Sequence, residues 1–180
     1  MFPQFVNHTV TNTTVGTRFV IAADMNNDGL IDILSGSLTD NKINWYENDG
    51  NQGFNLHFVA DATAPRSIFA IDLDRDGDMD ILAATELTNS IMWYANDGAG
   101  TFTPYVVTDT AIGASFVYGA DMDGDGDIDV LSASLDDDTV AWYENNGNQG
   151  FTKHDIDTTA DEARCVRAID LDNDGDMDVI

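Results

Sequence analysis

Short apolar runs separated by polar turns recur along the whole chain, and they come in a fixed order. In each unit, one run precedes an aspartate-rich loop, a second leaves the loop, a third carries a Trp-Tyr pair and a fourth begins at a phenylalanine. No run has the period of an amphipathic helix, and the fourth run alternates in character, so we expect four short strands per unit. The expected first strands are 19–23, 68–71, 116–120 and 165–169, and the expected second strands are 31–35, 79–83 and 128–133.

The unit repeats about every 49 residues, which is the length expected for a four-stranded blade of a β-propeller. The first aspartates of the four loops are 48, 49 and 49 residues apart, at Asp24, Asp72, Asp121 and Asp170. Each Trp-Tyr pair begins 21 residues after a loop's first aspartate, at Trp45, Trp93 and Trp142. We expect these aromatic side chains to fill the wedge between neighbouring sheets, where their burial contributes most to stability.

The fold class predicted from this pattern is all-β, a propeller of about 3.6 visible blades. We expect a single propeller domain or fragment over 1–180, with repeats at approximately 5–53, 54–101, 102–150 and a partial 151–180. Phe5 stands where a fourth strand would begin, and Ile180 lies just inside a second strand. Our hypothesis is therefore a piece of a larger propeller that is cut at its C-terminus.

The aspartate-rich loops have the composition of a site for a hard cation. Each nine-residue loop has Asp or Asn at positions 1, 3, 5 and 9 and glycine at position 6. Calcium takes about six to eight oxygen ligands, and glycine permits the sharp turn that points them inward. The predicted ligands, for up to four Ca²⁺ ions, are Asp24, Asn26, Asp28, Leu30 (through its carbonyl) and Asp32; Asp72, Asp74, Asp76, Asp78 and Asp80; Asp121, Asp123, Asp125, Asp127 and Asp129; and Asp170, Asp172, Asp174, Asp176 and Asp178.

Two other interpretations of the loops can be compared with this one. An EF-hand needs a glutamate at position 12 and flanking helices. Position 12 is instead Ser35, Ala83 or Ser132, and the flanks are strand-like, so the EF-hand is excluded. A solvated acidic turn without metal remains the alternative, more so for the first loop than for the other three.

The net charge of −26 comes more from the four loops than from a generally acidic surface, because 18 of the 33 acidic residues lie inside the loops. A surface this negative will not attract nucleic acid or an anionic membrane. The single cysteine, Cys165, excludes an internal disulfide, and we expect it to be a small buried apolar residue. No apolar run is long enough to span a membrane, and no signal peptide is visible at the start of the sequence.

No residue stands out as catalytic, and no cofactor other than calcium is expected. His8, His57 and His154 each fall three residues after the repeat's phenylalanine, so they are parts of the blade rather than a unique base. There is no activated nucleophile pattern and no phosphate-binding loop.

Three of the seven basic residues occupy one position of the repeat. Arg18, Arg66 and Arg164 each lie six residues before a loop, and Ser115 takes that place in the third unit. A partial ring of arginines near the axis could hold a carboxylate or sulfate group. The alternative is pairing with neighbouring acids such as Glu47, Glu144 or Asp138. The turns at 38–41, 87–89 and 135–138 vary between units, and a partner could bind there.

The stretch Ala-Asp-Met-Asp-Gly-Asp-Gly-Asp-Ile-Asp-Val-Leu (120–131), followed by Trp-Tyr-Glu-Asn (142–145) and Gly-Phe (150–151), resembles FG-GAP/VCBS repeats. Such repeats form the integrin α-subunit propeller and occur in many secreted bacterial proteins. The resemblance implies a propeller, usually seven-bladed, with calcium between the first and second strands of each blade and partners bound on the opposite face. Seven such units need about 343 residues, roughly twice the present length. Blade number is thus open, and two chains could complement each other or form an open arc.

The function expected from these features is a calcium-stabilised, non-catalytic module for extracellular protein or glycan binding, or adhesion. The partner would be a protein or an acidic glycan outside the cell, with no nucleic acid and no membrane insertion. The alternative is the propeller domain of a secreted enzyme, of the lyase or dehydratase type, that acts on sugars.

Overall fold

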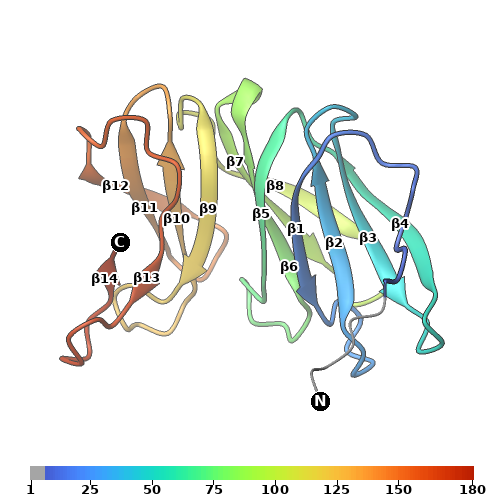
Figure 1. Cartoon of the computed structure of the whole chain (residues 1–180). Coiled ribbons are helices and arrows are strands. Elements are labelled where there is room, and N and C mark those ends of the chain that lie inside the picture. Colours follow the sequence, from blue (N-terminus) through green and yellow to red (C-terminus); the bar gives the residue numbers. More distant parts are fainter. Residues whose placement is uncertain (1–6) are drawn as a thin grey trace, which may run out of the picture.

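The computed structural model describes residues 7–180, so the expectation for Phe5 falls outside the described residues. The protein is all-β, as predicted, with three four-stranded antiparallel sheets followed by a two-stranded one (Figure 1). The sheets radiate side by side like propeller blades and do not close into a ring. Their strands are β1 (Thr17–Ala23), β2 (Asp32–Ser37), β3 (Lys42–Asn48) and β4 (Phe54–Asp61); β5 (Pro65–Ile71), β6 (Asp80–Thr85), β7 (Ser90–Asn96) and β8 (Phe102–Thr108); β9 (Ala114–Ala120), β10 (Asp129–Ser134), β11 (Thr139–Asn145) and β12 (Phe151–Asp157); and β13 (Ala168–Ile169) with β14 (Asp178–Val179).

Each four-stranded sheet uses four consecutive strands, in the order β1-β2-β3-β4 and its equivalents. A strand that begins at the repeat's phenylalanine, such as β4, therefore pairs with the strand before it and completes the sheet of the three preceding strands. Sheet boundaries lie between β4 and β5 and between β8 and β9, rather than at Phe54 and Phe102 where the repeats were divided. One short 3₁₀ turn, η1 (Glu86–Thr88), connects β6 to β7.

The last unit departs from the prediction in two places. The strand expected over 165–169 is restricted to β13, two residues long, which pairs only with β14. Cys165 lies in the preceding irregular segment and is exposed, so the expectation that it is buried is wrong. Without a regular strand and a third and fourth strand beside it, this segment has no sheet face to cover the thiol.

The hydrophobic cores lie between neighbouring sheets, as the aromatic repeat predicted. One core joins Leu34 and Trp45 of the first sheet to Ile81 and Tyr94 of the second. The next core repeats this arrangement, with Trp93 from the second sheet and Tyr143 from the third. Alternation along a strand explains the pattern, because the adjacent Trp and Tyr of one strand point to opposite faces of the sheet. The Trp93-Tyr94 pair of β7 thus fills one wedge with its Trp and the other wedge with its Tyr.

The strands β1, β5 and β9 lie closest to the axis of the arc (Figure 1). Their aromatic side chains meet there: the rings of Phe19 and Phe116 are 5.8 Å apart, edge to face, and those of Phe69 and Tyr118 are 4.7 Å apart. Gly119 shows how crowded this region is, since a Cβ atom there would lie 3.2 Å from two side-chain carbons of Ile71. Small residues at this repeat position let the inner strands approach.

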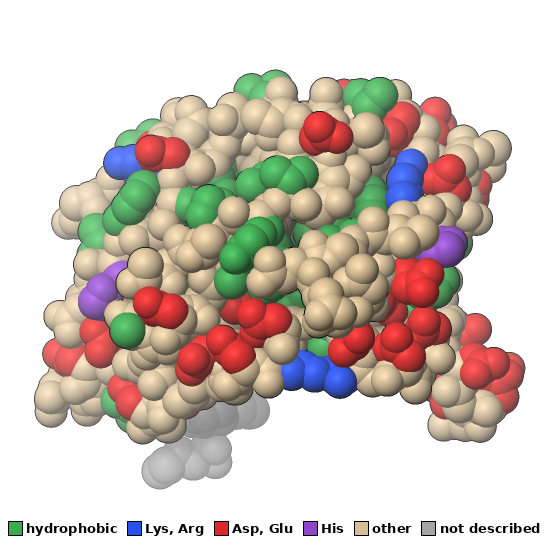
Figure 2. All heavy atoms as spheres, turned by 180° about the vertical axis from the view of Figure 1, so that it is seen from behind, with side chains coloured by type: hydrophobic (Ala, Val, Ile, Leu, Met, Phe, Trp, Pro, Cys, Tyr) green, Lys and Arg blue, Asp and Glu red, His purple; other side chains and the backbone are tan. Residues whose placement is uncertain are grey.

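The connections divide between two ends of the molecule. The loops between β1 and β2, β5 and β6, β9 and β10, and β13 and β14 gather at one end, which we call the loop end (Figure 1). The β2–β3 turn and its equivalents lie at the other end, together with the starts of β1, β5 and β9. Acidic side chains gather along the loop end in the space-filling view (Figure 2). Over residues 7–180, no helix is both long and apolar enough to cross a membrane.

The inter-sheet core predicts that Leu82→Ala will destabilise the protein. Leu82 is fully buried in the core between the second and third sheets, whereas Leu87 is 72% exposed. We expect Leu82→Ala to lower the free energy of unfolding by about 2–5 kcal/mol, because it removes buried methyl groups and leaves a cavity. Leu87→Ala is the matched control and should change it by less than about 0.5 kcal/mol. Urea unfolding of both variants measures this, and equal effects would contradict the assigned core.

Candidate metal centres

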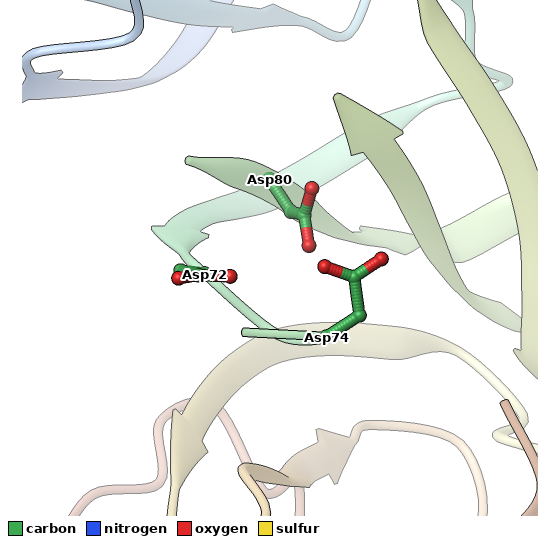
Figure 3. A group of neighbouring side chains, drawn as sticks. All are labelled: Asp72, Asp74 and Asp80. Carbon is green, nitrogen blue, oxygen red and sulfur yellow. The ribbon is translucent and has the colours of Figure 1, made fainter. Parts of the chain in front are cut away.

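Three of the four loops bring three aspartates together at positions 1, 3 and 9. In each cluster, one carboxylate oxygen from every residue lies within 4.8 Å of the others. Figure 3 shows the second cluster, in which Asp72 and Asp74 come from the loop and Asp80 from the start of β6. Each cluster therefore has the oxygen donors to hold a metal ion. The clusters are Asp72, Asp74 and Asp80; Asp121, Asp123 and Asp129; and Asp170, Asp172 and Asp178.

The loop backbone turns these carboxylates inward through its own amides. In the second loop, the Gly77 amide donates to Asp72 (3.0 Å) and the Asp76 amide donates to Asp74 (3.3 Å). Gly77 has a φ of +98°, a conformation that L side chains rarely adopt, which explains the glycine at position 6. The equivalent amide of position 5 donates to the side chain of position 3 in all four loops. The aspartates thus define the loop's shape as well as its charge.

The aspartate at position 9 has a second role, because it ties the loop to the blade. Asp80 is fully buried and accepts hydrogen bonds from the Leu73 amide (3.0 Å), the Trp93 indole (3.0 Å) and the Asn96 amide (2.8 Å). Leu73 belongs to the loop, whereas Trp93 and Asn96 belong to β7. We call this arrangement the aspartate clamp. Asp32 makes the same three bonds, to Met25, Trp45 and Asn48.

The clamp is less complete in the later units. Asp129 accepts from the amides of Met122 and Asn145, while the Nε1 atom of Trp142 is buried without a hydrogen-bond partner. Asp178 keeps the bond to the loop amide of Leu171 (2.9 Å). Its sheet has two strands in the described part of the chain, so no third strand contributes an indole.

Two further observations fit a cation in these clusters. The Oδ1 atoms of Asp72 and Asp170 are buried and have no hydrogen-bond partner, so a positive charge there would satisfy them. Burial raises the pKa of Asp80 to about 6, although its three hydrogen bonds act in the opposite direction. Burial also raises the pKa of Asp129, and burial followed by the nearby Asp76 raises the pKa of Asp74. Carboxylates whose ionisation is penalised in this way gain most from a bound cation.

The first loop is a weaker match. At positions 1, 3 and 9 it has two aspartates, Asp24 and Asp32, with Asn26 between them at position 3. The Asn26 side chain accepts from the Asp28 amide (3.2 Å) and donates to Glu47 (3.2 Å). Its amide oxygen can still ligate a cation, but this loop carries less negative charge than the others.

The aspartates predicted as ligands at positions 5 and 7 do not enter the clusters. Those at position 5 accept the amide of position 7, as Asp76 does from Asp78 (2.9 Å). At position 7, Asp78 and Asp127 face a neighbouring loop instead: Asn27 donates to Asp78 (3.0 Å), and Arg75 lies 3.5 Å from Asp127. Residues at position 4 thereby connect one loop to the next.

The three arginines at one repeat position meet as predicted. Arg18, Arg66 and Arg164 line one pocket of about 210 Å³, together with Phe19, Ser115 and Phe116. Arg66 makes a two-pronged ion pair with Glu86, and Arg164 pairs with Glu162. These acids differ from the partners suggested by the sequence. Glu47 and Glu144 instead contact His57 and His154, each at 2.8 Å.

The histidines pack within the blades. His57 stacks on Trp45 and His154 stacks on Trp142, with ring centroids 4.4 and 4.6 Å apart. Tyr105 takes the same position against Trp93, at 4.7 Å. The same position of the repeat stacks on the tryptophan in three blades, so the geometry assigns His57 and His154 a structural role.

Two constant spacings along the chain mark the hydrogen bonds of the aspartate clamp. The position-9 aspartate and the Trp are always 13 residues apart, and that aspartate and the Asn that ends the third strand are always 16 apart. Both spacings mark the clamp. In addition, position 4 is Asn27, Arg75 or Asn173 in three loops, and each has a φ near +60°, typical of a tight loop.

A model of the FG-GAP-like repeat family matches the chain three times, over residues 24–83, 72–132 and 121–180. No curated protein sequence matches the chain. Sixteen chains of solved structures match its fold, and two of them are described next. One is described as the structural basis of specific recognition of non-reducing terminal N-acetylglucosamine by an Agrocybe aegerita lectin; the TM-score is 0.65 at 20% identity, over 92% of this chain and 47% of that one.

The other structure is the V. cholerae biofilm matrix protein Bap1, with a TM-score of 0.54 at 24% identity, over 99% of this chain and 30% of that one. The present chain thus spans about half of the lectin and less than a third of the matrix protein. At these identities the two structures support the fold alone. The family model covers most of the sequence, and the loops it matches carry the aspartate clusters described above, so the chain belongs to the FG-GAP-like repeat family.

Proposed function

We propose that this chain is a calcium-stabilised, non-catalytic propeller module that binds a glycan or a protein outside the cell. The observation that carries the proposal is the double use of the position-9 aspartate. Asp80 belongs to a cluster that could hold a cation, and it also anchors the loop to Trp93 and Asn96 of the blade. An ion bound there would stabilise the blade itself.

Calcium suits the clusters better than other biological cations. The donors are all oxygens, from carboxylates and amides, which excludes the sites preferred by zinc or copper. Flexible loops with several carboxylates favour calcium over magnesium, which demands a rigid octahedral arrangement. The first, third and ninth residues of each loop would hold the ion, which would neutralise carboxylates that burial and mutual repulsion destabilise.

The binding part of the proposal rests on the residues and pockets outside the aspartate-rich loops and on the similarity of fold. His57 and His154 are used in packing against Trp45 and Trp142, which supports binding rather than chemistry. A polar cavity of about 390 Å³ lies between the second and third repeats, lined in part by Asp74, Asp127 and Asn145. A second, arginine-lined pocket lies at the opposite end. The fold likeness to a glycan-binding lectin and to a biofilm matrix protein supports an extracellular role of this kind.

The proposed sites predict a calcium-dependent stability with a countable number of ions. Isothermal titration calorimetry should give three to four ions per chain, because three loops form complete clusters and the first is weaker. At a tenfold excess over Kd, each filled site should add about 1.4 kcal/mol to the free energy of unfolding.

The variant Asp74→Ala removes a ligand of the second cluster and should lower the number of bound ions by one. Asp109→Asn, at an exposed site outside the loops, is the control and should leave the number unchanged. An unchanged number of ions in Asp74→Ala, or no calcium binding by the parent protein, would refute the assigned centres.

The raised pKa of Asp80 predicts a pH dependence of the calcium-free protein. The folded-state pKa is about 6 and the ordinary value is 3.8, so the folded state holds the proton more tightly. This contribution to stability is fully present below about pH 4 and is lost as the pH rises through about 6. Calcium competes with the proton, so calcium affinity should increase over the same range.

Urea unfolding of calcium-free protein between pH 4.5 and 7.5 measures this effect. Asp80→Asn cannot ionise and should flatten the decline, whereas Asp109→Asn should keep it. If Asp80→Asn retained the full decline with pH, Asp80 would not be its source.

A further inference from the structure

The pocket at the end opposite the candidate metal centres is lined by basic side chains and, within residues 7–180, by no acidic one, although the protein carries a formal charge of −26. It gathers three of the seven basic residues, Arg18, Arg66 and Arg164. They stand at the start of β1, at the start of β5 and in the segment before β13. Because the inner strands converge on the axis, side chains from three different repeats meet at one place.

The acids around the pocket neutralise only part of this charge. Arg66 is paired with Glu86, and both side chains are 22% exposed. Arg164 pairs with Glu162, but both side chains are more than 60% exposed, where an ion pair is weak and easily exchanged. Arg18 is exposed and makes no ion pair with any residue of 7–180. The hydrogen bond to Glu86 and the nearby charge of Asp136 both raise the pKa of Arg66. Of the three arginines, Arg18 is therefore the one that has no acidic partner within residues 7–180.

The pocket also has apolar walls. Phe19 and Phe116 line it beside the arginines, and their rings pack edge to face at 5.8 Å. Aromatic faces next to charged groups suit a ligand that has an apolar face and an ionised substituent, as a sugar ring with a carboxylate does. At about 210 Å³, the pocket is smaller than the roughly 300–1,000 Å³ of sites for drug-sized ligands, so it matches a single sugar unit.

We propose that this arginine pocket binds the anionic group, carboxylate or sulfate, of an acidic sugar. Arg18 makes the first contact because it has no competing acid, and Arg164 contributes by exchanging Glu162 for the ligand. Arg66 is held by Glu86 and mainly supplies positive potential. This inference rests on the proposed glycan-binding function and names the class of glycan.

The test is an NMR titration of the calcium-loaded protein with glucuronate, glucose 6-sulfate, glucose and N-acetylglucosamine. We expect one or both of the anionic sugars to shift signals around Phe19 and Phe116, whereas glucose does not. The anionic sugar that binds more tightly identifies carboxylate or sulfate as the source. Arg18→Ala should weaken its binding by about tenfold or more, as expected for loss of a charged hydrogen bond.

Two further variants distinguish binding from folding. Glu86→Gln releases Arg66 and should tighten binding of the anionic sugar, an effect that a purely structural ion pair would not produce. Lys153→Ala removes one positive charge from β12, outside the pocket, and should leave binding unchanged. The thermal melt of each variant checks that it is folded.

The inference is overturned if neither anionic sugar binds, or if Arg18→Ala binds as tightly as the parent protein while folded. Binding of N-acetylglucosamine, equally by the parent and by Arg18→Ala and without any binding of the anionic sugars, would overturn the arginine pocket but leave the proposed glycan-binding function intact. Failure of the parent to bind any glycan or extracellular protein on an array would refute the proposed function itself.

Discussion

A buried aspartate at the ninth position of the first three loops is the constraint on which the rest of this structure depends. In the first two blades it accepts hydrogen bonds from the loop, from the tryptophan of the third strand and from the backbone where that strand ends. The tryptophan in turn fills the wedge between two sheets. A carboxylate buried in this way is costly unless it is paired, so the clamp gives a physical reason for the aspartate-rich loop and the aromatic packing of the blade to recur together.

The two ends of the molecule then have different tasks. At the loop end, the aspartates gather in clusters, and polar contacts connect neighbouring loops to one another. At the other end, β1 and β5 begin beside the axis, and the arginines there line a pocket separate from the aspartate clusters. In this account, calcium maintains a scaffold, and the arginine pocket is a surface on which a ligand is recognised.

Much of the fold and part of the site could be predicted from the sequence, because the unit is repeated. The period and the alternation along strands were enough to predict three features. These are the order of the strands, the position of Trp45 and Trp93 in the wedges between sheets, and the convergence of the three arginines. What could not be predicted depends on contacts outside one repeat. β13 has only two residues and Cys165 lies outside any strand, and the ion pairs of Arg66 and Arg164 depend on side-chain geometry. Composition alone could not separate aspartates that converge from those, such as Asp78 and Asp127, that face the next loop.

The most direct test of the clamp is a double-mutant cycle on Asp80 and Trp93, measured as the free energy of unfolding in saturating calcium. Asp80→Asn alters the acceptor, and Trp93→Phe removes the indole donor while keeping an aromatic ring in the wedge. The account predicts a coupling of about 0.5–3 kcal/mol, as for residues that share one hydrogen-bond network. Effects that add within about 0.3 kcal/mol would show that the loop and the blade are stabilised independently, and would contradict the clamp.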